Sequence, residues 1–183
     1  VNPSVYGQSV TFTATVTAVA PGAGTATGTV EFRDAGSPIG SGILNGGTAT
    51  FATSSLSVAS HTITAVYSGD ANFTTSTSSP LTQTVNQDST TTTVASNANP
   101  SVYGQSVTFT ATVTAVAPGA GTPTGTIEFR DAGTPIGSGT LSGGTATFTT
   151  SSLSAGSHAI TAVYLGDASF TTSTSSPLTQ TVS

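Results

Sequence analysis

The stretch Val10-Thr-Phe-Thr-Ala-Thr-Val16 decides the fold of this chain, because its apolar and hydroxylated residues alternate strictly. In an extended strand, successive side chains point to opposite faces of the sheet. Val10, Phe12, Ala14 and Val16 therefore share one face, and the intervening threonines share the other. Threonine is β-branched and favours the pleated backbone on an exposed face. The pattern predicts a strand over residues 10–17 with one face against a hydrophobic core.

The same stretch returns as Val107–Val113, because the chain is a tandem repeat. Each residue from Val1 to Asn86 pairs without a gap with the residue 97 positions later, and 13 of the 86 pairs differ, which leaves 73 identical. At that level the two copies must share one fold. Tandem duplication suits a spacer or a multivalent surface better than an enzyme, because a catalytic centre gains nothing structural from being stacked.

Further alternating segments predict more strands in each copy. In the first copy they cover residues 29–33, 48–51, 61–67 and 81–85, with inward positions expected at Val30, Phe32, Ala49, Phe51, Ile63, Ala65 and Tyr67. Clusters of Gly, Pro, Asn and Asp indicate turns at residues 21–24, 34–38, 45–47 and 68–70. No stretch has helical spacing. Short strands separated by turns predict an all-β antiparallel sandwich with two sheets packed face to face.

The repeat predicts two domains, residues 1–86 and residues 87–183. The polar joint Asn86-Gln-Asp88 is short, so we expect the domains end to end with restricted bending. The extended segment Ser89–Val94 precedes the repeated motif in the second copy, whereas nothing precedes Val1. We therefore expect the first domain to lack its first strand and to expose a sheet edge, to which a neighbouring molecule's strand can add.

Composition excludes several classes of function. Charged residues make up 5% of the chain, and Arg33 and Arg130 are its only Lys or Arg side chains. A groove that neutralises phosphates cannot be assembled, so nucleic acid is not an expected partner. Without cysteine there is no disulfide or thiolate site, and without lysine there is no Lys–Asn isopeptide cross-link, whereas composition leaves a Thr–Gln ester link open.

The ends and hydropathy of the chain bear on its context. There is no apolar run near the roughly 18 residues of a membrane span, so we expect no membrane insertion in this segment. The chain starts at Val1 without a charged-then-apolar leader, and it looks like an internal piece of a longer protein.

Several segments together resemble the bacterial immunoglobulin-like (Big) repeats. They are Asn99–Val113, Pro123–Phe129, Gly143–Phe148 and Gly156–Tyr164, the last followed by Gly166-Asp167. The resemblance covers nearly the whole chain and implies two tandem immunoglobulin-like antiparallel β-sandwiches of Greek-key topology. It also implies tandem arrays in large secreted or surface-attached bacterial proteins, where such repeats serve as stalks, adhesin segments or spacers. It implies no catalytic or binding residue, so none is carried over.

His61 and His158 are the only histidines, one in each copy. A metal site needs two or three converging donors, and no carboxylate or second histidine stands nearby at ligand spacing. We expect each to be a half-buried imidazole bonded to the backbone. Catalysis by His with Ser and Asp is not expected, because nothing resembles a strained nucleophile turn.

The remaining candidates have simpler structural interpretations. Asp70 and Asp167 are expected to cap backbone N–H groups in a turn. Asp88 in the joint could form a calcium site with a loop carboxylate or with carbonyls from the preceding domain. The segment lacks an Asp-rich pattern, however, so we expect no metal and no cofactor. The charge clusters Glu31/Arg33/Asp34 and Glu128/Arg130/Asp131 are expected to be solvated strand faces. The rings of Tyr6 and Tyr103 are either sugar platforms or packed on the core rim.

The expected function is a non-catalytic spacer or stalk module of a bacterial cell-surface or secreted multidomain protein, related to adhesion. Its partners would be neighbouring repeats of the same protein, its location extracellular or at the cell surface, and its antiparallel strand ladders would resist extension. The alternative is a module that binds carbohydrate or a host protein through its loops or sheet faces. The absence of tryptophan weakens the carbohydrate version. No set of acid, base and nucleophile supports a hydrolase, so we expect no enzyme.

Overall fold

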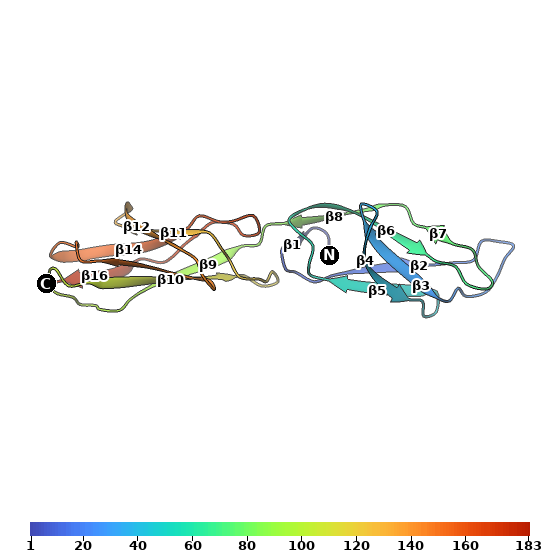
Figure 1. The fold of residues 1–183 in the computed structure, drawn as a ribbon, viewed down its shortest axis with the longest axis horizontal. Coiled ribbons are helices and arrows are strands. Elements are labelled where there is room, and N and C mark those ends of the chain that lie inside the picture. The colour runs from blue at the N-terminus through green and yellow to red at the C-terminus, as the bar shows by residue number, and fades with distance from the viewer. The chain divides into compact units, whose positions relative to one another are not determined.

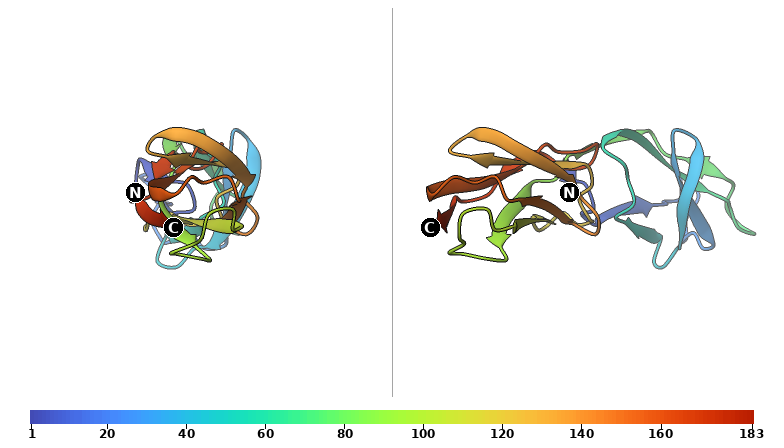
Figure 2. Two further views of the ribbon diagram at one scale, coloured as in Figure 1. Left: turned by 90° about the vertical axis from the view of Figure 1, so that its left-hand side faces the viewer. Right: turned by 60° about the vertical axis from the view of Figure 1, so that its left-hand side comes forward.

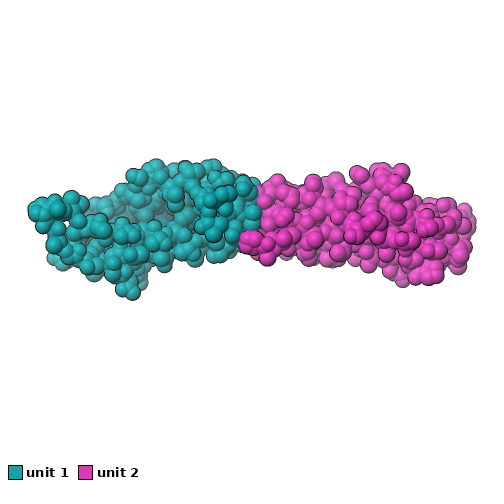
Figure 3. All heavy atoms as spheres, turned by 180° about the vertical axis from the view of Figure 1, so that it is seen from behind, with its two compact units in different colours: residues 1–86 teal, residues 87–183 magenta.

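The computed structural model describes residues 1–183 and contains strands, turns and loops but no helix (Figures 1 and 2). It therefore has no helix that is long and apolar enough to cross a membrane. The chain divides into two compact units, Val1–Asn86 (unit 1) and Gln87–Ser183 (unit 2), which are coloured separately in Figure 3. The all-β prediction is confirmed in both units.

Unit 1 consists of two sheets. The larger has the strand order β1-β8-β6-β3-β4, with the short β7 on β6, and the smaller is β2-β5. The strands are β1 (Ser4–Val5), β2 (Val10–Thr15), β3 (Thr29–Asp34), β4 (Ser37–Ile43), β5 (Thr48–Thr53), β6 (Ala59–Tyr67), β7 (Ser76–Thr77) and β8 (Leu81–Asn86).

Unit 2 repeats this plan with one strand more. Its sheets have the orders β12-β11-β14-β15, with β16 on β14, and β13-β10-β9. The strands are β9 (Thr90–Ser96), β10 (Val107–Ala115), β11 (Thr126–Asp131), β12 (Thr134–Thr140), β13 (Thr145–Thr150), β14 (Gly156–Tyr164), β15 (Ser173–Thr174) and β16 (Leu178–Val182).

Aromatic rings join the two sheets of unit 1 into a core. The alternation in β2 buries Val10, Phe12 and Ala14 and leaves the intervening threonines exposed, as the sequence predicts. The ring of Phe12 lies 6.4 Å from that of Phe32 on β3 of the opposite sheet, and Phe32 stacks on Phe51 at 5.8 Å. The period-2 pattern therefore produces two apolar faces that meet across the sandwich.

The sequence analysis missed β4, because it assigned residues 34–38 to a turn, and it also missed the two-residue strands β1 and β7. The equivalent β12 and β15 of unit 2 were missed with them. Only Ala35 and Gly36 form the turn, and both have positive φ, 45° and 87°. This two-residue loop matches the twist of a β-hairpin. The chain then returns as β4, an edge strand that tolerates Pro38 because an edge needs no second ladder of hydrogen bonds. Its glycines obscured the alternation on which strand prediction depends.

The last strand of each unit also makes a parallel pairing. β1 pairs with β8 so that Ser4 lies opposite Val85, and in unit 2 Ser101 bridges Val182 in the same sense. The sequence analysis expected only antiparallel ladders, and that expectation is wrong at this point. The alternation of side chains is the same in both kinds of ladder, so it does not distinguish them.

Candidate functional site

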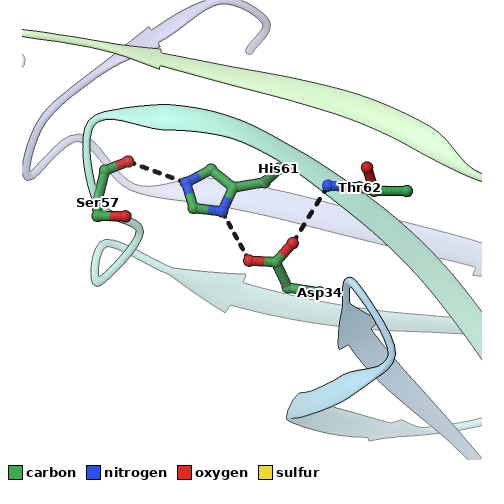
Figure 4. Close-up of polar contacts among 4 residues, drawn as sticks. All are labelled: Asp34, Ser57, His61 and Thr62. Atoms are coloured by element: carbon green, nitrogen blue, oxygen red, sulfur yellow. Dashed lines mark hydrogen bonds and ion pairs between the residues drawn. The ribbon is translucent and has the colours of Figure 1, made fainter.

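A histidine and an aspartate from different strands meet in each unit. In unit 1 the Nδ1 of His61 on β6 lies 2.6 Å from Oδ2 of Asp34, the last residue of β3 (Figure 4). The Nε2 of His61 lies 2.9 Å from the backbone oxygen of Ser57. The second carboxylate oxygen of Asp34 accepts the N–H of Thr62 at 3.1 Å. The His61 residue is 7% exposed, so this is a nearly buried, fully hydrogen-bonded cluster.

Unit 2 repeats the cluster with the same distances. His158 Nδ1 lies 2.6 Å from Asp131 Oδ2, and its Nε2 lies 2.9 Å from the backbone oxygen of Ser154. The sequence analysis correctly predicted a hydrogen bond from the imidazole to the backbone. Its statement that no carboxylate stands nearby is wrong. Asp34 and His61 are 27 positions apart and come together only because β3 pairs with β6. The signal available in the sequence was that both copies keep Asp and His at this separation.

The cluster contains serine, histidine and aspartate, but it does not have the geometry of a catalytic triad. In a triad, the serine hydroxyl hydrogen-bonds to the imidazole and becomes the nucleophile. Here Ser57 offers its backbone carbonyl oxygen, which only accepts hydrogen bonds. The imidazole is therefore held between two acceptors, and this arrangement stabilises the fold rather than activating a nucleophile.

Two acceptors around one imidazole favour its doubly protonated form, because both ring nitrogens must donate. Burial alone would lower the pKa of His61, but the hydrogen bonds to Ser57 and Asp34 outweigh it and raise the pKa. The pKa of His158 is raised by its hydrogen bond to Ser154 and then by the bond to Asp131. Each unit thus contains a nearly buried histidine–aspartate pair whose contacts favour the protonated imidazole.

We expect a stability that falls as the pH rises above about 6.5, the ordinary pKa of histidine. The raised folded-state pKa means that the native chain binds more protons than the unfolded one in this window. The stability that the two histidine–aspartate pairs contribute is therefore fully present below the unfolded-state pKa of histidine. It is lost as the pH rises through the folded-state pKa. Denaturant midpoints measured from about pH 5.5 to 9 should decrease over that range.

Because the chain has two histidines, NMR titration reads both imidazoles separately. Asp131→Asn should lower the pKa of His158 and leave the pKa of His61 unchanged, so that His61 serves as the internal control. Equal pKa values for His158 in the variant and the parent chain would contradict the role given to the carboxylate.

The carboxylates of Asp70 and Asp167 cap loops, as predicted. Asp70 Oδ2 accepts the hydroxyl of Thr27 at 2.7 Å and its N–H at 2.9 Å, and Oδ1 accepts the N–H groups of Asn72 and Phe73 at 2.8 and 2.9 Å. These bonds, led by that of the Thr27 hydroxyl, hold the pKa of Asp70 far below its usual range. Asp167 makes the same bonds in unit 2. The function of both is to tie two loops together.

The sequence placed Asp88 in the joint between the domains, whereas in the structure it is a buried residue of unit 2. It is 2% exposed, its N–H donates to Ser169 O at 2.9 Å, and its carbonyl accepts the N–H of Thr171 at 2.8 Å. Burial raises the pKa of its carboxyl group. No group of three or more His, Cys, Asp or Glu side chains that could hold a metal ion occurs in the chain.

Two further predictions, for the charge clusters and for Tyr103, have different outcomes. Glu31 pairs with Arg33, and Glu128 pairs with Arg130 at 2.5 Å, on partly exposed strand faces as expected. Such exposed pairs contribute less than about 1 kcal/mol. Tyr103 does not pack on the core rim, because it is 73% exposed.

The buried glutamines, Gln83 and Gln180, lie beside serine rather than threonine. Gln180 Nε2 donates to Ala98 O at 2.8 Å and to Ser101 Oγ at 3.2 Å, and Gln83 Nε2 donates to Ser4 Oγ at 3.2 Å. No threonine hydroxyl bonds to either amide group, so the structure gives no support to a Thr–Gln ester link. The amide groups join the last strand of each unit to Ser4 in unit 1 and to Ala98 and Ser101 in unit 2.

Comparison with known proteins agrees with this fold. The model of the family described as bacterial Ig-like domain (group 3) matches residues 1–86 and 92–183. A search of curated proteins found no match. Among solved structures, the chain is similar to the Clostridium thermocellum CbhA fibronectin(III)-like modules, with 19% identity, a TM-score of 0.37, and coverage of 99% of this chain and 87% of that one.

It is also similar to the mouse nectin-like molecule 4 ectodomain (Ig1-Ig3), with 13% identity and a TM-score of 0.35. That match covers 99% of this chain but 62% of the ectodomain, so the chain spans less than two thirds of it. The family model, in contrast, covers nearly all of both units. The chain therefore belongs to the bacterial Ig-like domain (group 3) family, of which it contains two copies in tandem.

Proposed function

We propose that this chain is a non-catalytic spacer that transmits mechanical tension within a bacterial cell-surface or secreted multidomain protein. The observation that carries the proposal is a parallel pairing with the last strand of each unit: β1 pairs with β8 in unit 1, and Ser101 pairs with Val182 of β16 in unit 2. The same arrangement of polar groups occurs twice in one chain, which is what a repeated mechanical element requires.

In unit 1 the two ends are fastened by side chains as well as by backbone. Asn2 donates from Nδ2 to Thr82 O at 2.6 Å, and its Oδ1 accepts the N–H of Thr84 at 3.1 Å. A backbone bond joins Tyr6 N to Asn86 O at 2.9 Å. The first residues of the unit are therefore bound along the length of β8.

Unit 2 has the same fastening. Asn99 bonds to Thr179 O at 2.7 Å and to Thr181 N at 3.0 Å. Ser101 N donates to Thr181 O and Ser183 N donates to Ser101 O, both at 2.9 Å. The asparagine is thus the equivalent anchor in both copies.

The direction of pairing determines how these bonds respond to tension. When parallel strands at opposite ends of a chain segment are pulled apart, they slide along each other. All the bonds between them are then loaded together, whereas an antiparallel hairpin pulled from its open end loses its bonds one at a time. A terminal parallel pair therefore resists extension by shear, and it is suited to a segment that stays folded under load.

The remaining polar groups favour a structural role over a catalytic one. The only histidines are held by Asp34 and Asp131, and Asp70 and Asp167 are occupied in loops. The surface has few charges, because charged residues make up 5% of the chain. A neutral, hydroxyl-rich surface limits unspecific electrostatic attraction to other molecules.

Single-molecule stretching of the full chain between terminal handles tests this proposal. We expect two unfolding events, each releasing about 3.3–3.6 Å for every residue of one unit. Asn99→Ala should lower the force of one event and leave the other unchanged, because it removes two bonds between Asn99 and β16 in unit 2. Thr124→Val is the matched control, since it removes a loop hydrogen bond to Asp167 away from the terminal strands.

Equal forces for Asn99→Ala and Thr124→Val would contradict the mechanical role of the parallel pair. Specific, saturable binding of the isolated chain on a glycan array would instead favour a recognition module.

A further inference from the structure

The turn between β4 and β5 contains the only Asn-Gly pair of the chain, Asn45-Gly46. Asn45 N donates to Thr48 O at 2.9 Å, and Thr48 N donates to Asn45 O at 3.1 Å. Gly46 and Gly47 lie between these two residues, and both have positive φ, 60° and 78°. This is the two-residue loop of a tight β-hairpin, in which both central residues need positive φ.

The two groups that can react with each other in this turn are unoccupied. Asn45 is exposed, and neither its side-chain amide nor the N–H of Gly46 makes a hydrogen bond. The space around Gly46 is open, because a Cβ placed on it would have no neighbour within 4 Å. The nitrogen of Gly46 can therefore approach the side-chain carbon Cγ of Asn45 without displacing another group.

A backbone nitrogen that follows an asparagine can attack the side-chain amide. The N–Cγ bond forms and closes a five-membered succinimide ring, the Cγ–Nδ2 bond breaks, and the backbone proton leaves with the ammonia. Water then adds to one of the two ring carbonyls and opens the ring, which gives aspartate or isoaspartate. One water is consumed and one ammonia is released, so no oxidant or cofactor is needed. Glycine favours the attack, since it has no Cβ beside the nitrogen and its backbone adopts conformations that other residues avoid.

The other asparagines of the chain lack this combination. Asn2 and Asn99 precede proline, whose nitrogen carries no hydrogen. The remaining three, Asn72, Asn86 and Asn97, precede residues with a Cβ. Asn45 is therefore the asparagine at which succinimide formation meets the least hindrance.

Unit 2 contains the same turn without the reactive amide. Ser142 stands at the position of Asn45, is also exposed, and exchanges backbone bonds with Thr145 at 2.8 and 3.2 Å. Gly143 and Gly144 have φ values of 58° and 78°, close to those in unit 1. Serine has no amide, so no succinimide can form there. Two turns of one geometry thus differ in the one group that the reaction requires.

We propose that Asn45 is a self-modifying site, at which the nitrogen of Gly46 expels ammonia from the side chain and water completes the conversion to aspartate and isoaspartate. The tip of the hairpin supplies the motion that ring closure needs, because exposed turns open more readily than core strands. Water is the only other reactant. The reaction depends on the turn alone, so the proposal stands or fails independently of the mechanical role.

The two products change unit 1 in different ways. Aspartate keeps the backbone and adds a negative charge at an exposed position, which makes the formal net charge of −5 one unit more negative. Isoaspartate places an extra backbone carbon between residues 45 and 46, so the two bonds between Asn45 and Thr48 cannot both be kept. The carbonyl of Gly47 accepts the N–H of Val16 at 2.8 Å, so isoaspartate also disturbs the contact of the turn with the end of β2.

Ageing of the full chain at mildly alkaline pH tests the proposal, since a higher pH favours loss of the backbone proton. Peptide mapping by mass spectrometry, after pepsin digestion at low pH, should show a gain of about 1 Da at residue 45, the difference between an amide and an acid. The equivalent peptide of unit 2 should keep its mass. Isoaspartate methyltransferase should label the aged chain, and NMR should show shifted amide signals for Val16 and Thr48 but not for Val113 and Thr145.

Three variants separate this reaction from general ageing. Asn45→Ser introduces the residue that unit 2 carries in the same turn, so the fold is kept, and it should abolish the change in unit 1. Ser142→Asn should create a second site in unit 2, because Gly143 follows it with the same backbone conformation. Gly46→Ala places a Cβ beside the nitrogen and should slow the conversion severalfold.

Three results would each overturn the proposal. The first is an unchanged mass at residue 45 in the folded chain while the urea-unfolded chain reacts, because the turn would then prevent ring closure. The second is equal conversion at Asn45 and Asn72, and the third is an inert Ser142→Asn variant.

Discussion

Phe129→Ala is expected to destabilise unit 2 by about 3–5 kcal/mol, the usual range for removing a large core aromatic side chain. Phe129 on β11 is 0% exposed, and its ring stacks on Phe148 with centroids 5.7 Å apart. The substitution removes most of the buried apolar contact of the side chain and leaves a cavity between the sheets. β9 closes unit 2 on this side, so the surrounding strands have little freedom to collapse into the space.

Calorimetry of the full chain measures this effect, because the loss should appear only in the transition of unit 2. Phe32→Ala is the matched substitution in unit 1. It should cost less, since Phe32 already borders a cavity of about 420 Å³ in unit 1. Leu165→Ala removes a half-exposed side chain of unit 2 and should change its stability by less than about 0.5 kcal/mol. A loss for Phe129→Ala as small as that for Leu165→Ala would show that the sheets are not packed around this ring.

Gly137→Ala is expected to destabilise unit 2 by about 1–3 kcal/mol through overpacking. A Cβ at Gly137 on β12 would lie 2.1 Å from Cε2 of Phe148. No side chain fits at that distance, so the phenyl ring must leave its stack on Phe129. Gly40 on β4 has the same relation to Phe51 in unit 1, with the same distance of 2.1 Å. The glycine is therefore required by the ring that lies across it.

The double variant Gly137→Ala/Phe148→Leu separates this clash from a general effect of alanine in the strand. Leucine lacks the ring atoms that meet the new Cβ, so the double variant should lose less stability than the sum of the two single variants. Urea denaturation of all four chains gives the interaction energy. Strictly additive losses would mean that Gly137 matters for a reason other than Phe148.

Much of the fold could be predicted because its main signal is local. The alternation over Val10–Val16 specifies which side chains face the core, whatever the sheet into which the strand is placed. β4 carried no such signal, since Pro38 and its glycines replace the apolar positions. Its place follows from the hairpin at Ala35-Gly36 and from the ring of Phe51, which lies over Gly40. Both features depend on neighbours in space.

The candidate site was less predictable for the same reason. His61 was recognised, but its carboxylate partner was not, because Asp34 lies 27 positions away on another strand. Asp88 looked like a residue of the short joint between the domains, yet it bonds to Ser169 and Thr171 about eighty positions later. A single sequence does not reveal such pairs, since their spacing reflects the path of the chain and not the geometry of one element.

By itself, the sequence determined the duplication and the two apolar faces, because period and identity are properties of neighbouring residues. Tertiary structure decided which acceptors hold each imidazole, that the segments at Ser4 and Ser101 pair in parallel with β8 and β16, and that β2 ends three residues earlier than β10 although residues 10–18 and 107–115 are identical. Each of these depends on hydrogen bonds between strands far apart in the chain, and those bonds exist only once the sheets have assembled.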